Sequence, residues 1–212
     1  MNKIKVIFWD FDGVILNSNE VRDSGFEIVL KDFPKNQVEL LLNYHRQNGG
    51  LSRYVKFRYF FEVIRGEKVS NKQIQDYASK FSEIMLNILT NKDLLINDSL
   101  SFIKKNKEKY RMHIVSGSDG KELKLLCKYL GIDHYFETIN GSPEIKINLV
   151  KKILDKYDYK IENCVLIGDS INDYEAAIIN KIKFLGYNYF QEKENITVLN
   201  SFSEFNTYNF NL

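Results

Sequence analysis

Short apolar runs rich in β-branched and aromatic residues alternate with amphipathic stretches along most of this chain. The runs predict strands at Ile4–Trp9, Met112–Ser116, Phe136–Asn140, Asn163–Gly168 and Ile182–Tyr187. The stretches between them predict helices at Asp98–Tyr110, Lys121–Leu130, Ile145–Tyr157 and Asp173–Asn180. Strands that are mostly apolar and alternate with helices indicate a parallel sheet covered on both faces. We therefore expect an α/β fold with a doubly wound, Rossmann-like core.

The stretch from residue 18 to residue 89 interrupts this alternation. It contains no convincing strand and predicts amphipathic helices at Glu20–Lys31, Asn36–His45, Ser52–Ile64 and Asn71–Ile88. Aromatic residues recur at helical spacing in the third of these, which indicates a packing core rather than a cofactor site. We expect a core domain of residues 1–17 and 90–212 and an inserted helical cap domain of residues 18–89.

The end of the chain carries a weaker apolar run, Ile196–Leu199, which predicts an edge strand. The segment after it is rich in Asn and Phe. We expect this tail to lie on the surface.

Composition narrows the classes of function. The net charge is only +2 and the basic residues are spread along the chain, so the electrostatic footprint of a nucleic-acid-binding protein is missing. No apolar run approaches the roughly 20 residues that span a bilayer. Asp10 and Asp12 interrupt the amino-terminal apolar run before a signal peptide could form. Cys127 and Cys164 lack metal-type spacing. We expect a cytoplasmic monomer with no nucleic-acid or membrane partner.

Two aspartates stand one residue apart where the first predicted strand ends. Asp10 and Asp12 flank Phe11, and Gly13 follows. Aspartate is a poor strand former, and ligands of open parallel sheets bind at the carboxyl ends of strands, which favours a functional pair. Asp-Gly is also an ordinary turn signal. On this motif alone, the turn and the active site are equally supported.

Further polar residues follow the other predicted strands. Ser116 and Gly117 end the second strand, Lys146 follows the third, and Asp169 and Asp173 follow the fourth. Each has an ordinary alternative, because Ser-Gly is a common turn, a lone lysine is usually solvated, and Asp173 could cap the next helix. The carboxyl ends of parallel strands share one edge of the sheet, so together these residues indicate a single site.

The chemistry of this set points to phosphoryl transfer. Clustered carboxylates repel one another, and Mg²⁺, which prefers oxygen ligands, relieves that repulsion. A metal ion, a lysine and a hydroxyl together neutralise a transferring phosphoryl group. The remaining carboxylates are then a nucleophile and a proton donor.

In order, spacing and placement, these residues resemble the four motifs of the haloacid dehalogenase superfamily. The motifs are Asp10-Phe11-Asp12-Gly13, Ser116, Lys146 and Gly168-Asp169-Ser170-x-x-Asp173. The resemblance covers essentially the whole chain, and the helical insertion is similar to the cap of one large branch. In that branch the cap closes over the active site and helps to select the substrate.

The resemblance implies a role for each motif residue. Asp10 would attack the phosphoester and carry an aspartyl-phosphate, and Asp12 would be the general acid and base. Ser116 and the backbone near Gly117 would hold the phosphoryl oxygens, and Lys146 would neutralise charge. Asp10, the backbone carbonyl of Asp12 and Asp169 would bind Mg²⁺, with Asp173 ligating it or orienting its shell.

Two positions separate the reactions within the superfamily. An acid at Asp12 favours a phosphatase or a phosphomutase, because dehalogenases and phosphonatases of the superfamily lack one there. The cap segment 48–53 is similar to a loop of the β-phosphoglucomutase branch, in which the arginine that matches Arg53 grips a second phosphate. Mutases of that branch carry a histidine where this chain has Arg22. We therefore favour the phosphatase.

The cap offers several candidate substrate contacts, although helices expose Lys and Arg routinely. They are Arg22, Arg46, Asn48, Arg53, Lys56 and Arg58. Arg53 is favoured first and Asn48 next, because the adjacent glycines would let that loop approach a ligand.

We predict a Mg²⁺-dependent phosphatase that hydrolyses a small phosphorylated metabolite, a sugar, polyol or amino-alcohol phosphate, through an aspartyl-phosphate. The alternatives are a β-phosphoglucomutase-like phosphomutase and a phosphoacceptor signalling module. The second alternative is disfavoured because such modules normally carry their nucleophile on a later strand and need no helical insertion.

Overall fold

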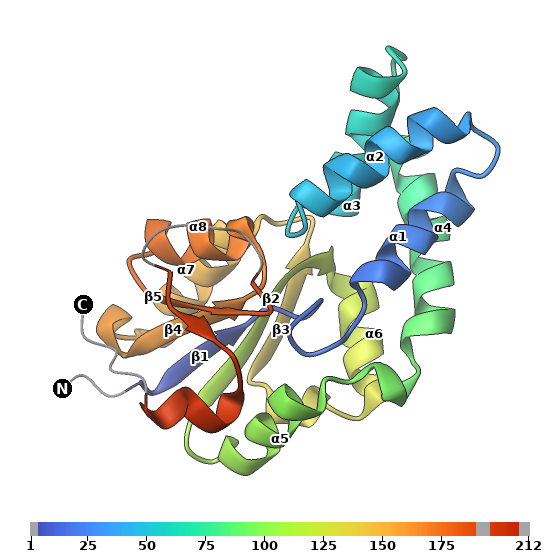
Figure 1. Ribbon diagram of the computed structural model, residues 1–212. Coiled ribbons are helices and arrows are strands. Elements are labelled where there is room, and N and C mark those ends of the chain that lie inside the picture. Colours follow the sequence, from blue (N-terminus) through green and yellow to red (C-terminus); the bar gives the residue numbers. More distant parts are fainter. Residues whose placement is uncertain (1–3, 190–195, 208–212) are drawn as a thin grey trace.

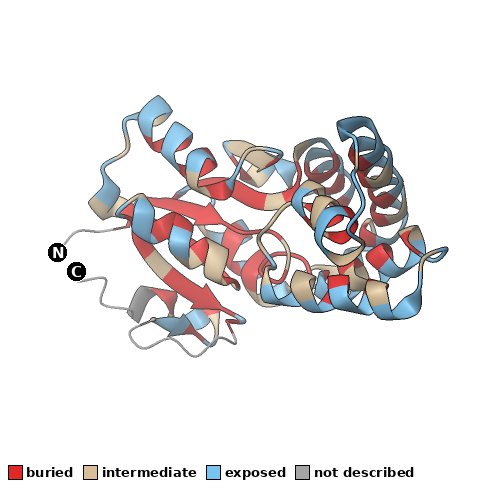
Figure 2. Ribbon diagram, turned by 90° about the horizontal axis from the view of Figure 1, so that it is seen from above, coloured by how far each residue is buried: buried red, intermediate tan, exposed pale blue. Residues whose placement is uncertain are grey.

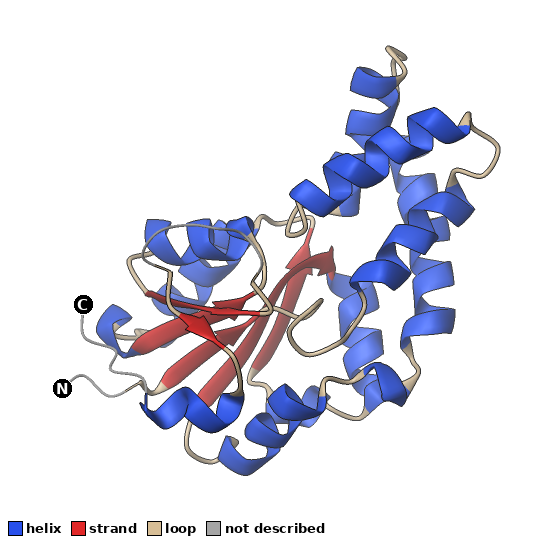
Figure 3. Ribbon diagram, viewed as in Figure 1, coloured by secondary structure: helices blue, strands red, loops and turns tan. Residues whose placement is uncertain are grey.

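A parallel sheet forms the centre of the protein. The computed structural model describes residues 4–189 and 196–207. Within these residues the sheet has the strand order β3-β2-β1-β4-β5-β6, and every neighbouring pair is parallel (Figures 1 and 3). The strands are β1 (Val6–Trp9), β2 (Arg111–Asp119), β3 (Thr138–Ser142), β4 (Cys164–Gly168), β5 (Lys183–Tyr187) and β6 (Val198–Leu199). The predicted edge strand is confirmed.

Helices cover both faces of this sheet. They are α5 (Asn97–Asn106), α6 (Gly120–Leu130), α7 (Lys146–Tyr157) and α8 (Ile171–Ile179). Along β1, Val6 and Phe8 pack into one cluster with α7 and α8, and Ile7 and Trp9 pack into the other. Both sets are buried, as the burial colouring of the strands in Figure 2 shows. The doubly wound α/β architecture predicted from the sequence is confirmed.

The second body is helical and stands beside the carboxyl ends of the strands (Figure 1). Its helices are α1 (Asn19–Val29), α2 (Lys35–Gln47), α3 (Arg53–Tyr59) and α4 (Asn71–Leu89), and a π-helical turn, Phe60–Ile64, follows α3. Phe26, Phe57 and Phe81 are buried together, with ring centroids of Phe26 and Phe81 4.5 Å apart. The predicted aromatic packing core is therefore present. We propose residues 18–89 as the cap domain.

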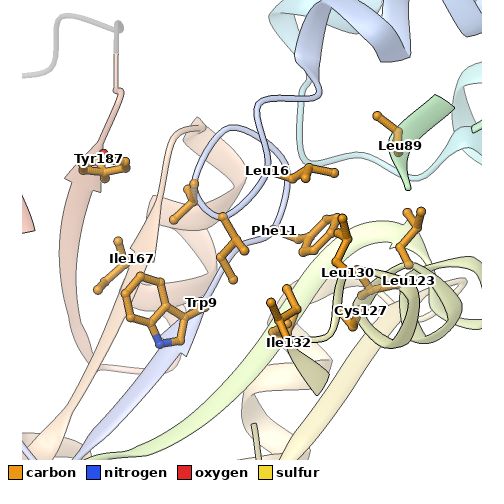
Figure 4. Packing of buried hydrophobic residues seen from close by; sticks show 14 of the residues in the cluster. Trp9, Phe11, Leu16, Leu89, Leu123, Cys127, Leu130, Ile132, Ile167 and Tyr187 are labelled. Atoms are coloured by element: carbon orange, nitrogen blue, oxygen red, sulfur yellow. The ribbon is translucent and has the colours of Figure 1, made fainter. Parts of the chain in front are cut away.

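Two neighbouring segments connect the cap to the core. Leu16 lies where the chain leaves the core and Leu89 where it returns, and both belong to the cluster of buried residues around Trp9 and Phe11 shown in Figure 4. The segments are hydrogen bonded to each other, since the amide of Asn17 donates to the carbonyl of Leu94 at 2.8 Å. The two connections therefore run side by side and are paired by backbone hydrogen bonds.

The tail differs from the sequence expectation. The 3₁₀ helix Phe202–Thr207 follows β6, and Phe202 and Phe205 are buried rather than surface-lying. Their rings lie 5.1 Å and 4.8 Å from that of Phe102, and Phe202 also contacts Trp9. The expectation was wrong because two isolated phenylalanines among polar residues show no periodicity. Residues 208–212 lie outside the described part.

The remaining short helices are 3₁₀ turns at Lys92–Leu94, Asp133–Tyr135 and Ile161–Asn163. In the described ranges, none of the helices combines the length and apolar character needed to cross a membrane.

Candidate active site

Asp10 lies at the switch point of the sheet. It follows β1, whose neighbours β2 and β4 continue the sheet in opposite directions, and this is where open α/β sheets bind ligands. The turn after it depends on Gly13, whose φ is +76°. A Cβ on Gly13 would lie 2.0 Å from Oδ2 of Asp169, so only glycine lets the turn come this close.

Three carboxylates meet at this edge. Oxygens of Asp10, Asp169 and Asp173 lie within 4.8 Å of one another. Burial and then the charge of Asp173 raise the pKa of Asp10 well above its ordinary value, and the same two causes raise the pKa of Asp169 to about 7. The cluster is therefore crowded with negative charge, and a cation would lower its energy.

Lys146 supplies one such charge from the first turn of α7. Its Nζ donates to Oδ1 of Asp10 at 2.8 Å and also to Oδ1 of Asp173. Burial works to lower the pKa of Lys146, but the two carboxylates outweigh burial and raise it. Lys146 is thus held as a cation against the predicted nucleophile.

Asp173 caps α8 and also contacts the ammonium group of Lys146. Its Oδ2 accepts hydrogen bonds from the amide and hydroxyl of Ser170 at 3.1 Å and 2.6 Å, which caps α8. Its Oδ1 accepts from Lys146. Since both oxygens are occupied, Asp10 and Asp169 are the carboxylates best placed to contact a metal directly, with Asp173 behind them. Asn19 steadies Asp169 by donating to its Oδ2 at 3.0 Å.

The carboxylate of Asp12 points away from this cluster. Ser18 and Ser118 donate to it at 2.5 Å each, and Nε of Arg22 donates at 3.0 Å. Burial works to raise the pKa of Asp12, but the Arg22 charge and these hydrogen bonds outweigh burial and lower it. The side chain is therefore held in place as a carboxylate, and its role in proton transfer stays a prediction. Metal binding by the Asp12 carbonyl stays a prediction.

A cavity of about 400 Å³ lies over these groups, between the core and the cap. Ser116 and Gly117 line its core side, and Ser116 is buried with its Oγ accepting from the amide of Ser118 at 3.1 Å. The cap loop closes on the same strand end. A Cβ on Gly117 would lie 2.3 Å from the carbonyl oxygen of Gly50, so glycine is needed for this contact.

The favoured cap residue, Arg53, lines the cavity, but its charge is already paired. Its Nη1 donates to Oε2 of Glu122 on α6 at 2.5 Å and to Oγ of Ser82 at 2.7 Å. Arg22 donates to Oε1 of the same glutamate at 2.5 Å. Two arginines of the cap therefore share one buried carboxylate of the core.

Two of the remaining cap candidates line the cavity and two do not. Asn48 donates to the carbonyl of Tyr44 at 2.9 Å and Arg58 to Glu62 at 2.7 Å, and neither lines the cavity. Arg46 lines the cavity but pairs with Asp23 at 2.7 Å. Lys56 lines it from α3.

Sequence reasoning missed several residues of this site. They are Ser18, Asn19, His45, Ser118 and Glu122. Ser118 and Glu122 stand close to the Ser116 motif, so proximity to a motif was the available signal. The partners of Glu122 are 69 and 100 residues away, and no local pattern indicates them.

Fold and site together define a doubly wound α/β protein with a carboxylate cluster, a buried lysine and a helical insertion beside the site. A family model described as haloacid dehalogenase-like hydrolase matches residues 6–187. The chain belongs to this family, which confirms the resemblance found in the sequence. No curated protein sequence matches the chain significantly.

Solved structures of the same fold cover nearly the whole chain. CbbY from Rhodobacter sphaeroides in complex with phosphate is 17% identical over 95% of this chain and 96% of its own, with a TM-score of 0.76. A predicted phosphoglycolate phosphatase from Haemophilus somnus is 20% identical over 98% of both chains, with a TM-score of 0.77. The HAD-hydrolase YfnB from Bacillus subtilis, bound to magnesium, is 12% identical over 97% and 98%, with a TM-score of 0.71.

Proposed function

We propose that this protein is a Mg²⁺-dependent phosphatase that hydrolyses a small phosphomonoester through an aspartyl-phosphate on Asp10. The observation that carries the proposal is the contact of Lys146 with Asp10 at 2.8 Å, beside the cavity that Asp10 and Asp169 line. Lys146 holds Oδ1 of Asp10, which leaves the other oxygen to attack phosphorus. The phosphate, the phosphatase activity and the magnesium named for the similar structures agree with this function.

The reaction divides between the two aspartates of the first motif. A bond forms between Asp10 and phosphorus while the bond from phosphorus to the alcohol breaks, and Asp12 gives its proton to the departing oxygen. A water molecule then attacks phosphorus, loses a proton to Asp12, and releases Asp10 as a carboxylate. Before the first step, Arg22 must leave Asp12 while keeping its 2.5 Å hydrogen bond to Glu122. The Asp12 carboxylate, whose pKa Arg22 lowers, can then take up from solvent the proton that it gives to the departing oxygen.

Metal binding is proposed at Asp10 and Asp169. The donor set fits Mg²⁺, because these are hard oxygen ligands whose pKa values are raised by burial and by the charge of Asp173. When bound, Mg²⁺ neutralises charge on the phosphoryl oxygens. Ser116 and the backbone at Gly117 would orient the same oxygens, since both line the cavity.

The structure favours neither alternative function. The arginine that would grip a second phosphate in a mutase, Arg53, is paired with Glu122. Arg22, in place of the mutase histidine, contacts Asp12 directly. A signalling module has no use for a cavity that a helical insertion lines on one side.

The decisive experiment replaces the nucleophile. We expect Asp10→Asn to abolish phosphate release from p-nitrophenyl phosphate while the circular dichroism spectrum and melting temperature stay close to wild type, because Asn keeps the shape of the side chain and cannot form the acyl phosphate. Near-wild-type turnover by Asp10→Asn would disprove the mechanism. Isomerisation of a hexose phosphate by the wild-type protein would instead favour the mutase.

A further inference from the structure

The arginines around the cap end of the cavity all have carboxylate partners within the protein. Arg22 and Arg53 share Glu122, Arg22 also pairs with Asp12, and Arg46 pairs with Asp23. The described ion pairs thus set three arginines against three carboxylates. Glu20 also lines the cavity, but it is exposed. These cations are therefore satisfied within the protein.

Lys56 is the cavity-lining basic residue that is left without a carboxylate partner in the described part of the chain, and burial lowers the pKa of its ammonium group to about 7. Its side chain is buried, with 2% of the residue exposed, and among the described residues no carboxylate lies within ion-pair distance of its Nζ. Its two hydrogen-bond acceptors are uncharged atoms, Nδ1 of His45 at 2.6 Å and the carbonyl oxygen of Gly49 at 3.2 Å. An ammonium group has three hydrogens, so one remains for a further partner.

His45 cannot supply the missing charge. Burial, and then the charge of Lys56, lower the pKa of His45 to about 2, so the ring is neutral. Its Nδ1 accepts from Lys56, and its Nε2 faces Oδ1 of Asp23 at 3.5 Å. Phe26 packs against the ring at 4.9 Å between centroids. The histidine therefore aims Lys56 without neutralising it.

We propose that Lys56, aimed by His45, receives a second anionic group of the substrate. The substrate class is then a phosphomonoester that also carries a carboxylate or a second phosphate, and a neutral alcohol phosphate is a poor ligand. The inference rests on the proposed function, because it takes Asp10, Ser116 and Lys146 as the site of the phosphoryl group that is removed. Burying a lysine without an anion is costly, and an anionic ligand removes that cost.

The competing explanation is structural. Lys56 ties α3 to the cap loop through the carbonyl of Gly49, and that contact alone could account for its burial. A structural tie affects all ligands equally, whereas an anion receptor affects only ligands with a second charge. The test therefore compares ligands of one carbon skeleton.

Binding is measured by calorimetry in the Asp10→Asn background, where no turnover interferes. The ligands are glycerol 3-phosphate, 3-phosphoglycerate and glycerol 1,3-bisphosphate, which present a hydroxymethyl group, a carboxylate and a phosphate at the same position. We expect at least one of the two doubly anionic ligands to bind about tenfold or more tightly than glycerol 3-phosphate, and Lys56→Met to remove this preference. The ligand that gains identifies the anionic group.

A second variant gives Lys56 an internal partner. His45→Glu places a carboxylate beside Nζ, and we expect it to remove the preference while Lys56 is still present. Lys72→Met is the matched control, because Lys72 is an exposed cap lysine outside the cavity. The preference should survive in this control.

The proposal is overturned if neither doubly anionic ligand binds more tightly than glycerol 3-phosphate. It is also overturned if Lys56→Met weakens all three ligands by the same factor, or if the preference survives both Lys56→Met and His45→Glu. Phosphate release by the protein with Asp10 intact is measured separately. Its absence for every ligand would disprove the proposed phosphatase, while the binding preference would still decide the role of Lys56.

Discussion

Arg53 of the cap donates from Nη1 to Oε2 of Glu122 in the core at 2.5 Å, and neither residue is more than 5% exposed. Arg22 donates to the other oxygen of the same carboxylate and also contacts Asp12. Burial works to raise the pKa of Glu122, but the two arginines outweigh burial and lower it. Glu122 thus ties the cap to the core through two arginines. One of them, Arg22, also orients Asp12, the proposed general acid.

This relationship changes what is expected of Arg53. Because the side chain holds the cap to the core, we expect Arg53→Ala to lower kcat/KM by a similar factor, about tenfold or more, for p-nitrophenyl phosphate and for the best metabolite substrate. Steady-state kinetics on both substrates measures the effect. Arg58→Ala is the control, since Arg58 lies outside the cavity and should leave both values unchanged. A loss confined to the metabolite would return Arg53 to direct substrate binding.

The dependence of activity on Mg²⁺ should change when a carboxylate of the cluster is removed. We expect EDTA to inactivate the enzyme and Mg²⁺ to restore it, and Asp169→Asn to raise the Mg²⁺ concentration for half-maximal activity by about tenfold or more. The reason is that Lys146 and Ser170 occupy the two oxygens of Asp173. Asp169 and Asp10 are therefore the cluster carboxylates that are left to bind the metal. Glu20→Gln removes a carboxylate that lines the cavity outside the cluster, and it should respond to Mg²⁺ like wild type. An unchanged Mg²⁺ response in Asp169→Asn would contradict the proposed site.

Stability should depend on pH through His113 in β2. Burial lowers the pKa of this fully buried histidine from its ordinary 6.5 to about 4, and its ring nitrogens bond Thr138 and Tyr159 at 2.9 Å and 3.1 Å. Between pH 6.5 and pH 4 the unfolded chain binds a proton that the folded protein does not, so stability falls as the pH falls. The stabilisation present above pH 6.5 is about 3 kcal/mol at most.

The free energy of unfolding, measured by urea titration between pH 7 and pH 4, tests this expectation. His113→Gln removes the titrating group, so its stability should change less over that window than the stability of wild type. Parallel pH curves for the two proteins would show that His113 contributes nothing to the pH dependence.

The tail offers a test of its packing. Phe205 is 1% exposed, with its ring 4.8 Å from that of Phe102 and 5.8 Å from that of Tyr110. We expect Phe205→Ala to lower the free energy of unfolding by about 3 kcal/mol or more, as large core truncations do. Tyr129→Ala, at a residue 63% exposed, should cost far less. Equal small losses would mean that the tail does not belong to the core.

The parts of the fold that could be predicted are those with a local signal. A strand buried on both faces must be apolar at every position, so β1 and β4 stand out from the flanking helices. The turn at Gly13 could also be predicted from the sequence, because its left-handed backbone favours glycine. The burial of Phe205 has no such signal, because its partners lie about a hundred residues away in the chain.

The residues of the candidate site also fall into those that the sequence could predict and those that it could not. The motif residues could be placed at one edge because parallel strands bring their carboxyl ends together. The role of Arg53 could not be predicted, because an arginine in a glycine-containing loop looks the same whether its partner is a ligand or Glu122. Lys56 had no sequence feature that separates it from an exposed helical lysine. Only its burial and its uncharged partners set it apart.

The sequence alone therefore determined the doubly wound core, the helical insertion and the set of candidate catalytic groups, because strand burial and motif spacing act over a few residues or along one sheet edge. Tertiary structure decided which of the basic residues that line the cavity have carboxylate partners and that Lys56, within the ranges that the structure describes, has none. Charge pairing depends on distances between side chains of different domains, and the position of a residue along the chain does not contain those distances.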